Sequence, residues 1–147
     1  MGKSNLKVAI LAAAAVAIAA LLVFVLFIPG QTALVLKNED TGKVYACFKA
    51  DEDTEFSVGF IHSVNKSEVR EYYSVSNYMI YLEKCLYSDF GAGVATEIEN
   101  GQELSYTEDG RMLISNIHRP IEGLSYIVGT VSDHILYIDG KEISLRT

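Results

Sequence analysis

Hydrophobic and polar positions follow two different patterns along the chain. From Val8 to Ile28 every residue is apolar, and no charged residue lies between Lys7 and Lys37. At about 1.5 Å per residue, a helix over this run is roughly 31 Å long, close to the bilayer hydrocarbon thickness of about 30 Å. The run therefore predicts one transmembrane helix over Val8 to Ile28.

The charges that flank this run predict its orientation. Lys3 and Lys7 precede it, and the first acidic residue is Glu39. By the positive-inside rule, the amino terminus is cytoplasmic and the chain after the helix lies outside the cell membrane. A cleaved signal peptide is the alternative, but the run exceeds the roughly 7 to 15 apolar residues of a secretory signal. We expect a retained signal anchor over residues 1–30 and an extracytoplasmic domain over residues 31–147.

After the anchor, apolar residues recur at every second position in short runs bounded by Gly, Asn and Asp. This pattern is typical of β-strands. It predicts one all-β domain, an antiparallel sandwich or barrel of about eight to nine short strands. Asp139-Gly140 suits a type I′ hairpin turn, and residues 91–110 suit a long surface loop. The expected strands are 33–38, 43–49, 55–64, 69–75, 78–88, 111–117, 124–129, 134–138 and 141–145.

The central hairpins suggest an unusual polar pair on an apolar sheet face. A four-residue loop over 65–68 sets His62 opposite Glu71, and a two-residue turn at 76–77 also turns Glu71 toward that face. A carboxylate there needs a partner, because an isolated buried charge is costly. The pair either closes the hairpin structurally or lines a concave site together with Ser63. As an acid-base pair in an open pocket, it would make the domain an envelope enzyme.

Charge and candidate ligands narrow the function classes further. All 19 acidic residues follow the anchor, whereas two of the 12 basic residues precede it, so the domain is strongly acidic. Such a surface disfavours nucleic acid as a partner. The three histidines have no metal-ligand spacing, and we expect no metal and no cofactor. Cys47 and Cys85 lie outside the anchor, where they form a disulfide or remain two buried thiols.

Short motifs form an ordered set along the chain from about Phe56 to Leu145. They are His62-Ser63-Val64-Asn65-Lys66 with Glu71, Asp89-Phe90-Gly91-Ala92-Gly93 with Glu97, Ile117-His118-Arg119, Val128-Gly129, His134 and Asp139-Gly140. This set resembles domain of unknown function family 1850. The family comprises small prokaryotic proteins with an amino-terminal membrane segment, often encoded beside tripartite ATP-independent periplasmic (TRAP) transporters with a TAXI-like receptor.

The resemblance implies an accessory or small-ligand-binding component beside a TRAP-type importer, and it brings no catalytic residue. The partner would be the transporter permease or its solute receptor. The two alternatives are the envelope enzyme and a purely structural, membrane-proximal interaction domain. Ile127 replaces an expected basic residue, which weakens any anion site near that strand. The implied ligand- or partner-binding residues are His62, Ser63, Glu71, Phe90, Gly91, Gly93 and Arg119.

Overall fold

The computed structural model describes residues 2–27, 30–64, 66–88 and 98–146. The chain divides into two units, Met1–Gln31 and Thr32–Thr147. The first unit contains one helix and the second contains every strand described. The expected all-β architecture behind one apolar helix is therefore confirmed.

The helix α1 spans Lys3–Phe27. Its stretch from Asn5 to Leu26 has a mean hydropathy of 3.0, and none of that stretch is buried within the protein. A helix that exposes apolar side chains on every side is typical of a membrane span. The expected segment agrees with this helix as far as Phe27, and its last residue, Ile28, lies outside the described residues.

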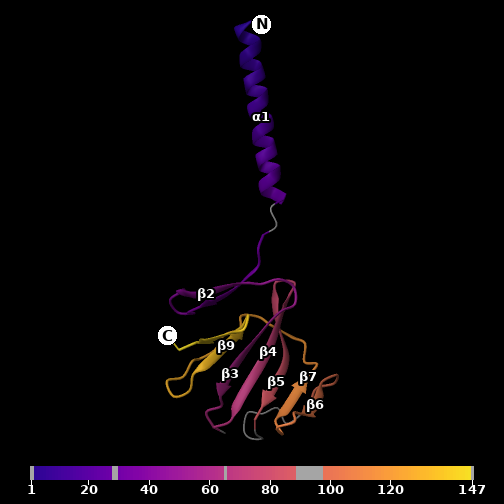
Figure 1. The fold of residues 1–147 in the computed structure, drawn as a ribbon, viewed down its shortest axis with the longest axis vertical. Coiled ribbons are helices and arrows are strands. Elements are labelled where there is room, and N and C mark those ends of the chain that lie inside the picture. Colours follow the sequence, from indigo (N-terminus) through magenta and orange to yellow (C-terminus); the bar gives the residue numbers. More distant parts are fainter. Residues whose placement is uncertain (1, 28–29, 65, 89–97, 147) are drawn as a thin grey trace. The chain divides into compact units, whose positions relative to one another are not determined.

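The second unit contains two antiparallel sheets (Figure 1). One is the hairpin of β1 and β2. In the other, the strands follow the order β10-β9-β3-β4-β5-β7-β6, and β8 pairs with β5 away from this path. The strand bounds are β1 Ala33–Lys37, β2 Val44–Lys49, β3 Thr54–Ile61, β4 Glu68–Ser76, β5 Met79–Tyr87, β6 Glu103–Tyr106, β7 Met112–Ser115, β8 Arg119–Ile121, β9 His134–Ile138 and β10 Lys141–Ser144.

One face of the large sheet forms the core. Alternate residues of neighbouring strands share this face, because successive side chains of a strand point to opposite sides. The β1–β2 hairpin and the segment 117–126 supply the side chains that pack against it. Buried residues of the large sheet on this face include Phe56, Val58, Tyr73, Val75, Leu82, Cys85, Leu136 and Ile138.

The first central hairpin closes two residues earlier than expected. Val58 pairs with Glu71, and the backbone N–H of His62 donates to the carbonyl of Ser67 at 2.8 Å. The connection is therefore 63–66, in which Lys66 adopts a left-handed conformation with φ of 56°. The predicted pairing of His62 with Glu71 is wrong. Because the partner shifts by four residues, an even number, Glu71 still faces the core as expected.

The second central hairpin, in contrast, turns one residue later than expected. Its turn residues are Asn77 and Tyr78, with φ of 49° and 61°. Two consecutive residues with positive φ define a type I′ turn, which fits the twist of a hairpin. Further from the turn, a bulge on β5 between Leu82 and Lys84 sets Glu71 opposite Cys85. The expected type I′ turn at Asp139-Gly140 is confirmed, since both residues have positive φ.

Three short elements differ from the expected strands. Strand β6 lies inside the segment expected to be a loop, and β8 has only three residues around Pro120. An alternating pattern would bury Leu104 and Tyr106 of β6, but both side chains are exposed. The expected strand 124–129 is irregular. Its Tyr126 is held by a side-chain hydrogen bond to the sheet, so the segment needs no strand ladder.

Of the two alternatives for Cys47 and Cys85, the structure has free thiols and not a disulfide. Strand alternation explains why the two do not pair. Phe48 of β2 points into the core, so its neighbour Cys47 points outward and is exposed, while Cys85 of β5 is buried. The alternative of two free thiols holds, although only one of them is buried.

The two thiols should react at very different rates. Burial raises the pKa of the Cys85 thiol to about 11. Since the thiolate is the reactive form, we expect Cys85 to alkylate more than about a hundredfold more slowly than Cys47 at pH 8. Mass spectrometry after iodoacetamide treatment should find one label on the native chain and two after denaturation. Two labels at equal rates on the native chain would contradict the buried position of Cys85.

Candidate functional site

The core face holds a cluster of three oxygen-bearing side chains. The Oε2 atom of Glu71 accepts hydrogen bonds from the hydroxyls of Tyr73 at 2.9 Å and Tyr126 at 2.5 Å. The two phenol oxygens lie 2.5 Å apart. Tyr73 neighbours Glu71 on β4, whereas Tyr126 comes from the irregular segment that covers the core. The cluster therefore ties this segment to the centre of the sheet.

The tyrosines of this cluster are held as neutral donors. Burial raises the pKa of the Tyr73 and Tyr126 hydroxyls far above their ordinary range, and the negative charge of Glu71 raises both further. A neutral hydroxyl that donates to a carboxylate makes a strong, charge-assisted hydrogen bond. The arrangement suits a structural role, here called the Glu71 clasp, because the two tyrosine hydroxyls occupy one of the two carboxylate oxygens.

A second group of titratable side chains surrounds the clasp. Cys85 lies opposite Glu71 on β5, and burial also raises the pKa of the Tyr87 hydroxyl. Arg119 pairs with Leu82 on the same strand β5, and its positive charge opposes the pKa rise of both Cys85 and Tyr87. The ring of His134 stacks on Phe60 with centroids 4.8 Å apart.

His134 carries an unsatisfied polar atom. Its Nδ1 atom is buried and has no hydrogen-bond partner among the described residues. The residue is 9% exposed, and burial lowers its pKa below the ordinary value. The backbone N–H of Leu145 donates to the carbonyl of His134 at 2.8 Å. The neutral imidazole is therefore part of the core.

The expected site residues do not form one site. His62 lies in the β3–β4 connection, where its Nδ1 accepts a hydrogen bond from the Val64 N–H at 3.4 Å. Val58, the partner of Glu71, is four residues away, so His62 and Glu71 are separated by roughly 13 Å along the strand. An acid-base pair of these two residues is therefore excluded. Ser63 is exposed in the same connection.

The remaining expected site residues lie in different parts of the chain. Arg119 begins β8, where it is exposed and lies opposite Leu82. Among the described members of the set, Glu71 and Arg119 both pair with β5, Glu71 opposite Cys85 and Arg119 opposite Leu82, whereas His62 and Ser63 lie together in the β3–β4 connection. Phe90, Gly91 and Gly93 lie outside the described residues.

The three histidines have different surroundings. His118 stacks on Tyr81 with centroids 4.6 Å apart, and its Nδ1 lies 3.0 Å from the Glu83 carboxylate. His62 lies in a turn, and His134 lies in the core. Within the described ranges, no three His, Cys, Asp or Glu side chains group closely enough to hold a metal ion.

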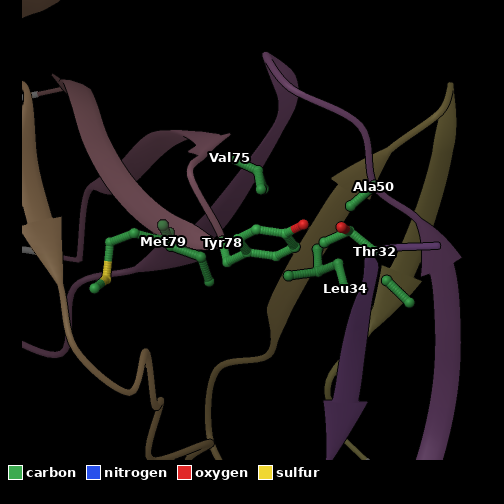
Figure 2. A pocket seen from close by; sticks show the side chains of 8 residues that line it. Thr32, Leu34, Ala50, Val75, Tyr78 and Met79 are labelled. Atoms are coloured by element: carbon green, nitrogen blue, oxygen red, sulfur yellow. The ribbon is translucent and has the colours of Figure 1, made fainter. Parts of the chain in front are cut away.

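A small hollow lies between the start of β1 and the tip of the β4–β5 hairpin (Figure 2). Figure 2 shows the ring of Tyr78 extending toward Thr32 and Leu34. The hollow has a volume of about 130 Å³. Ligand pockets are usually at least about 300 Å³, so this space is a packing gap beside an exposed tyrosine.

A larger groove lies on the outer face of the large sheet. No sequence motif indicates this groove. It has a volume of about 410 Å³, and Arg70 and Tyr72 of β4 line it together with Tyr137 of β9. The only sequence signal was the alternation of β4, which turns Arg70 and Tyr72 away from the core when Glu71 faces it. Tyr137 joins them because β9 pairs with β3, a non-consecutive pairing that no local pattern reveals.

Comparison with known proteins identifies the family. The sequence model of the family described as Domain of unknown function (DUF1850) matches residues 56–145. The match covers more than half of the chain, so the chain belongs to this family. No curated protein and no solved structure matches it. The matched region begins in β3 and ends just after β10, and it contains the Glu71 clasp and every lining residue of the outer groove except Glu55.

Proposed function

We propose that this member of the DUF1850 family is a membrane-anchored, extracytoplasmic accessory of a TRAP-type solute importer. The observation that carries the proposal is the short tether between anchor and domain. The helix ends at Phe27, and the second unit begins at Thr32, whose carbonyl already accepts a hydrogen bond from Ala50. Five residues of extended chain span at most about 18 Å. The domain can therefore meet only partners that lie at the membrane surface.

Exposed apolar side chains support a partner-binding role for the domain. Ile127 and Val131 are 95% and 89% exposed, and Tyr78 is 85% exposed at the β4–β5 turn. Large apolar side chains so fully in water commonly mark interaction sites when they cluster. Ile127 and Val131 belong to one irregular segment, four residues apart. We take this segment as the first candidate for contact with a transporter subunit.

Crosslinking in native membranes tests the proposal. A photoreactive amino acid at Ile127 or Tyr78 should yield adducts with a permease or solute-receptor subunit. The same amino acid at Glu108, which is exposed in the β6–β7 turn, is the matched control and should yield few adducts. If cells that produce the importer yield no adduct with any transporter subunit from Ile127 or Tyr78, the accessory role is wrong.

Lengthening the tether provides an independent test. Inserting about twenty Gly and Ser residues between Gly30 and Gln31 should lower the effective concentration of the domain at its partner by about tenfold. The yield of adducts from Ile127 or Tyr78 should fall accordingly, while the free energy of unfolding of the β domain stays unchanged. An unchanged yield would show that membrane proximity does not control the contact.

A further inference from the structure

The groove on the outer face contains a cation that the fold holds in place. The guanidinium carbon of Arg70 lies 3.8 Å from the centroid of the Tyr137 ring and 5.5 Å from that of Tyr72. The Nε–H of Arg70 donates to Ser57 Oγ at 3.0 Å, and Ser57 is only 5% exposed. Stacking and this hydrogen bond together fix the plane of the guanidinium group.

Gly59 makes this stack possible. A Cβ atom at this position would lie 3.2 Å from Cε2 of Tyr137, which is closer than nearly all real Cβ contacts. The ring of Tyr137 thus lies directly against the backbone of β3, with Arg70 also in contact with the ring. Arg70 of β4 is therefore held by the Ser57 hydroxyl of β3 and the Tyr137 ring of β9, and Gly59 of β3 leaves room for that ring.

The positive charge of Arg70 is not neutralised by an ion pair. Among the described residues, no carboxylate lies within 4.0 Å of its guanidinium nitrogens, although three other basic residues do have such partners. Its Nε donates to Ser57, and no hydrogen bond from its two terminal nitrogens is found among the described residues. A planar pair of N–H donors is the usual partner of a carboxylate.

The rest of the groove has the opposite charge. Glu55, Asp139 and Glu142 line it, against one further cation, Lys141. Glu142 pairs with Tyr137 on the neighbouring strand, so it lies beside the ring on which Arg70 stacks. A ligand with only a carboxylate would meet repulsion from three acids, and a ligand with only an ammonium group would meet repulsion from Arg70. A ligand that carries both charges on neighbouring atoms satisfies both sides.

We propose that this groove, here called the Arg70 groove, binds a free α-amino acid as a zwitterion. The α-carboxylate lies on the terminal nitrogens of Arg70, and the α-ammonium group faces the acidic side formed by Glu55, Asp139 and Glu142. The rings of Tyr72 and Tyr137 flank the site and supply apolar surface to the ligand side chain. The volume of about 410 Å³ lies within the range of small-molecule sites. Binding here is independent of whether a transporter is the partner of the domain.

The test uses the purified full chain in detergent and each of the twenty L-amino acids at 10 mM. At least one amino acid should raise the melting temperature, and calorimetry should then give its Kd. The N-acetyl derivative, which lacks the ammonium group, and the amide, which lacks the carboxylate, should each bind at least tenfold more weakly. Equal binding of the N-acetyl derivative, or no response to any amino acid, would overturn the proposal.

Two variants locate the site, with a matched control. R70K keeps the charge but loses the planar donor pair, and E142Q removes one acidic partner while leaving the sheet intact. Each should weaken binding by about tenfold, whereas R111K, whose arginine pairs with Asp109 outside the groove, should not change it. Circular dichroism verifies that each variant folds. Unchanged binding in a folded R70K and a folded E142Q would place any amino-acid site elsewhere.

Discussion

Replacing Glu71 with alanine should lower the free energy of unfolding of the β domain by about 2 to 3 kcal/mol. The carboxylate accepts two hydroxyl hydrogen bonds, from Tyr73 and Tyr126. Without it, the two hydroxyls can bond only to one another, and one buried donor is left unsatisfied. Each hydrogen bond to a charged acceptor contributes about 1.5 to 3 kcal/mol to stability. The contributions of two bonds that share one acceptor do not simply add. Urea unfolding of the wild type and the variant measures the difference.

The size of the Glu71 effect also decides what the clasp is for. Glu71→Gln keeps an accepting oxygen and should cost only about 1 kcal/mol. Glu103→Ala, at an exposed position of β6, should change stability by less than about 0.5 kcal/mol. A loss below 1 kcal/mol in Glu71→Ala would mean that water replaces the carboxylate. The residue would then be free to act as a ligand-binding group, as the family resemblance implied.

Lowering the pH below about 6.5 should destabilise the domain through His134, by at most about 1.4 kcal/mol per pH unit. Burial lowers the pKa of His134 in the folded state, although the charges of Asp133 and Glu71 oppose this shift. The unfolded chain therefore takes up a proton on this residue at a higher pH than the folded chain does. The stability of the folded state is full above the unfolded pKa of about 6.5 and falls as the pH drops toward the folded pKa.

Unfolding at pH 7.5, 6.0 and 5.0 should reveal this dependence. His134→Asn should flatten the slope, even if it lowers stability at every pH, because the group that titrates is gone. The depressed pKa of Asp133 contributes only below about pH 4, outside this window. A slope that persists in His134→Asn would assign the pH dependence to another group.

The core face of β4 could be predicted from sequence, but the partner of Glu71 could not. Alternation of apolar residues fixes which side chains share a face, and a pairing shift of four residues leaves that face unchanged. The partner depends on where the hairpin turns and on Tyr126, which lies 55 residues along the chain. Lys66 and Tyr78 adopt left-handed conformations that glycine or asparagine would usually signal, so both turns were expected at the wrong residues.

The Arg70 groove could be predicted from the sequence even less than the partner of Glu71. Its arginine and Tyr72 are neighbours on β4, but Ser57, Gly59 and Tyr137 come from strands joined by a non-consecutive pairing. No spacing in the sequence connects these residues. The motifs that carry the family resemblance also pass over Arg70, although one of their residues, Glu71, is its neighbour on β4.

The sequence alone determined the apolar helix, the all-β class, the inward direction of Glu71 and the type I′ turn at Asp139-Gly140. Each of these depends on a local property of the chain: a continuous apolar run, an alternation with a period of two, or the residue types of a turn. Tertiary structure alone decided that Glu71 is clasped by two tyrosines, that Cys47 and Cys85 remain apart, and that Arg70 stacks on Tyr137. These contacts join segments that are distant in sequence, and strand pairing and turn position select them rather than any local preference.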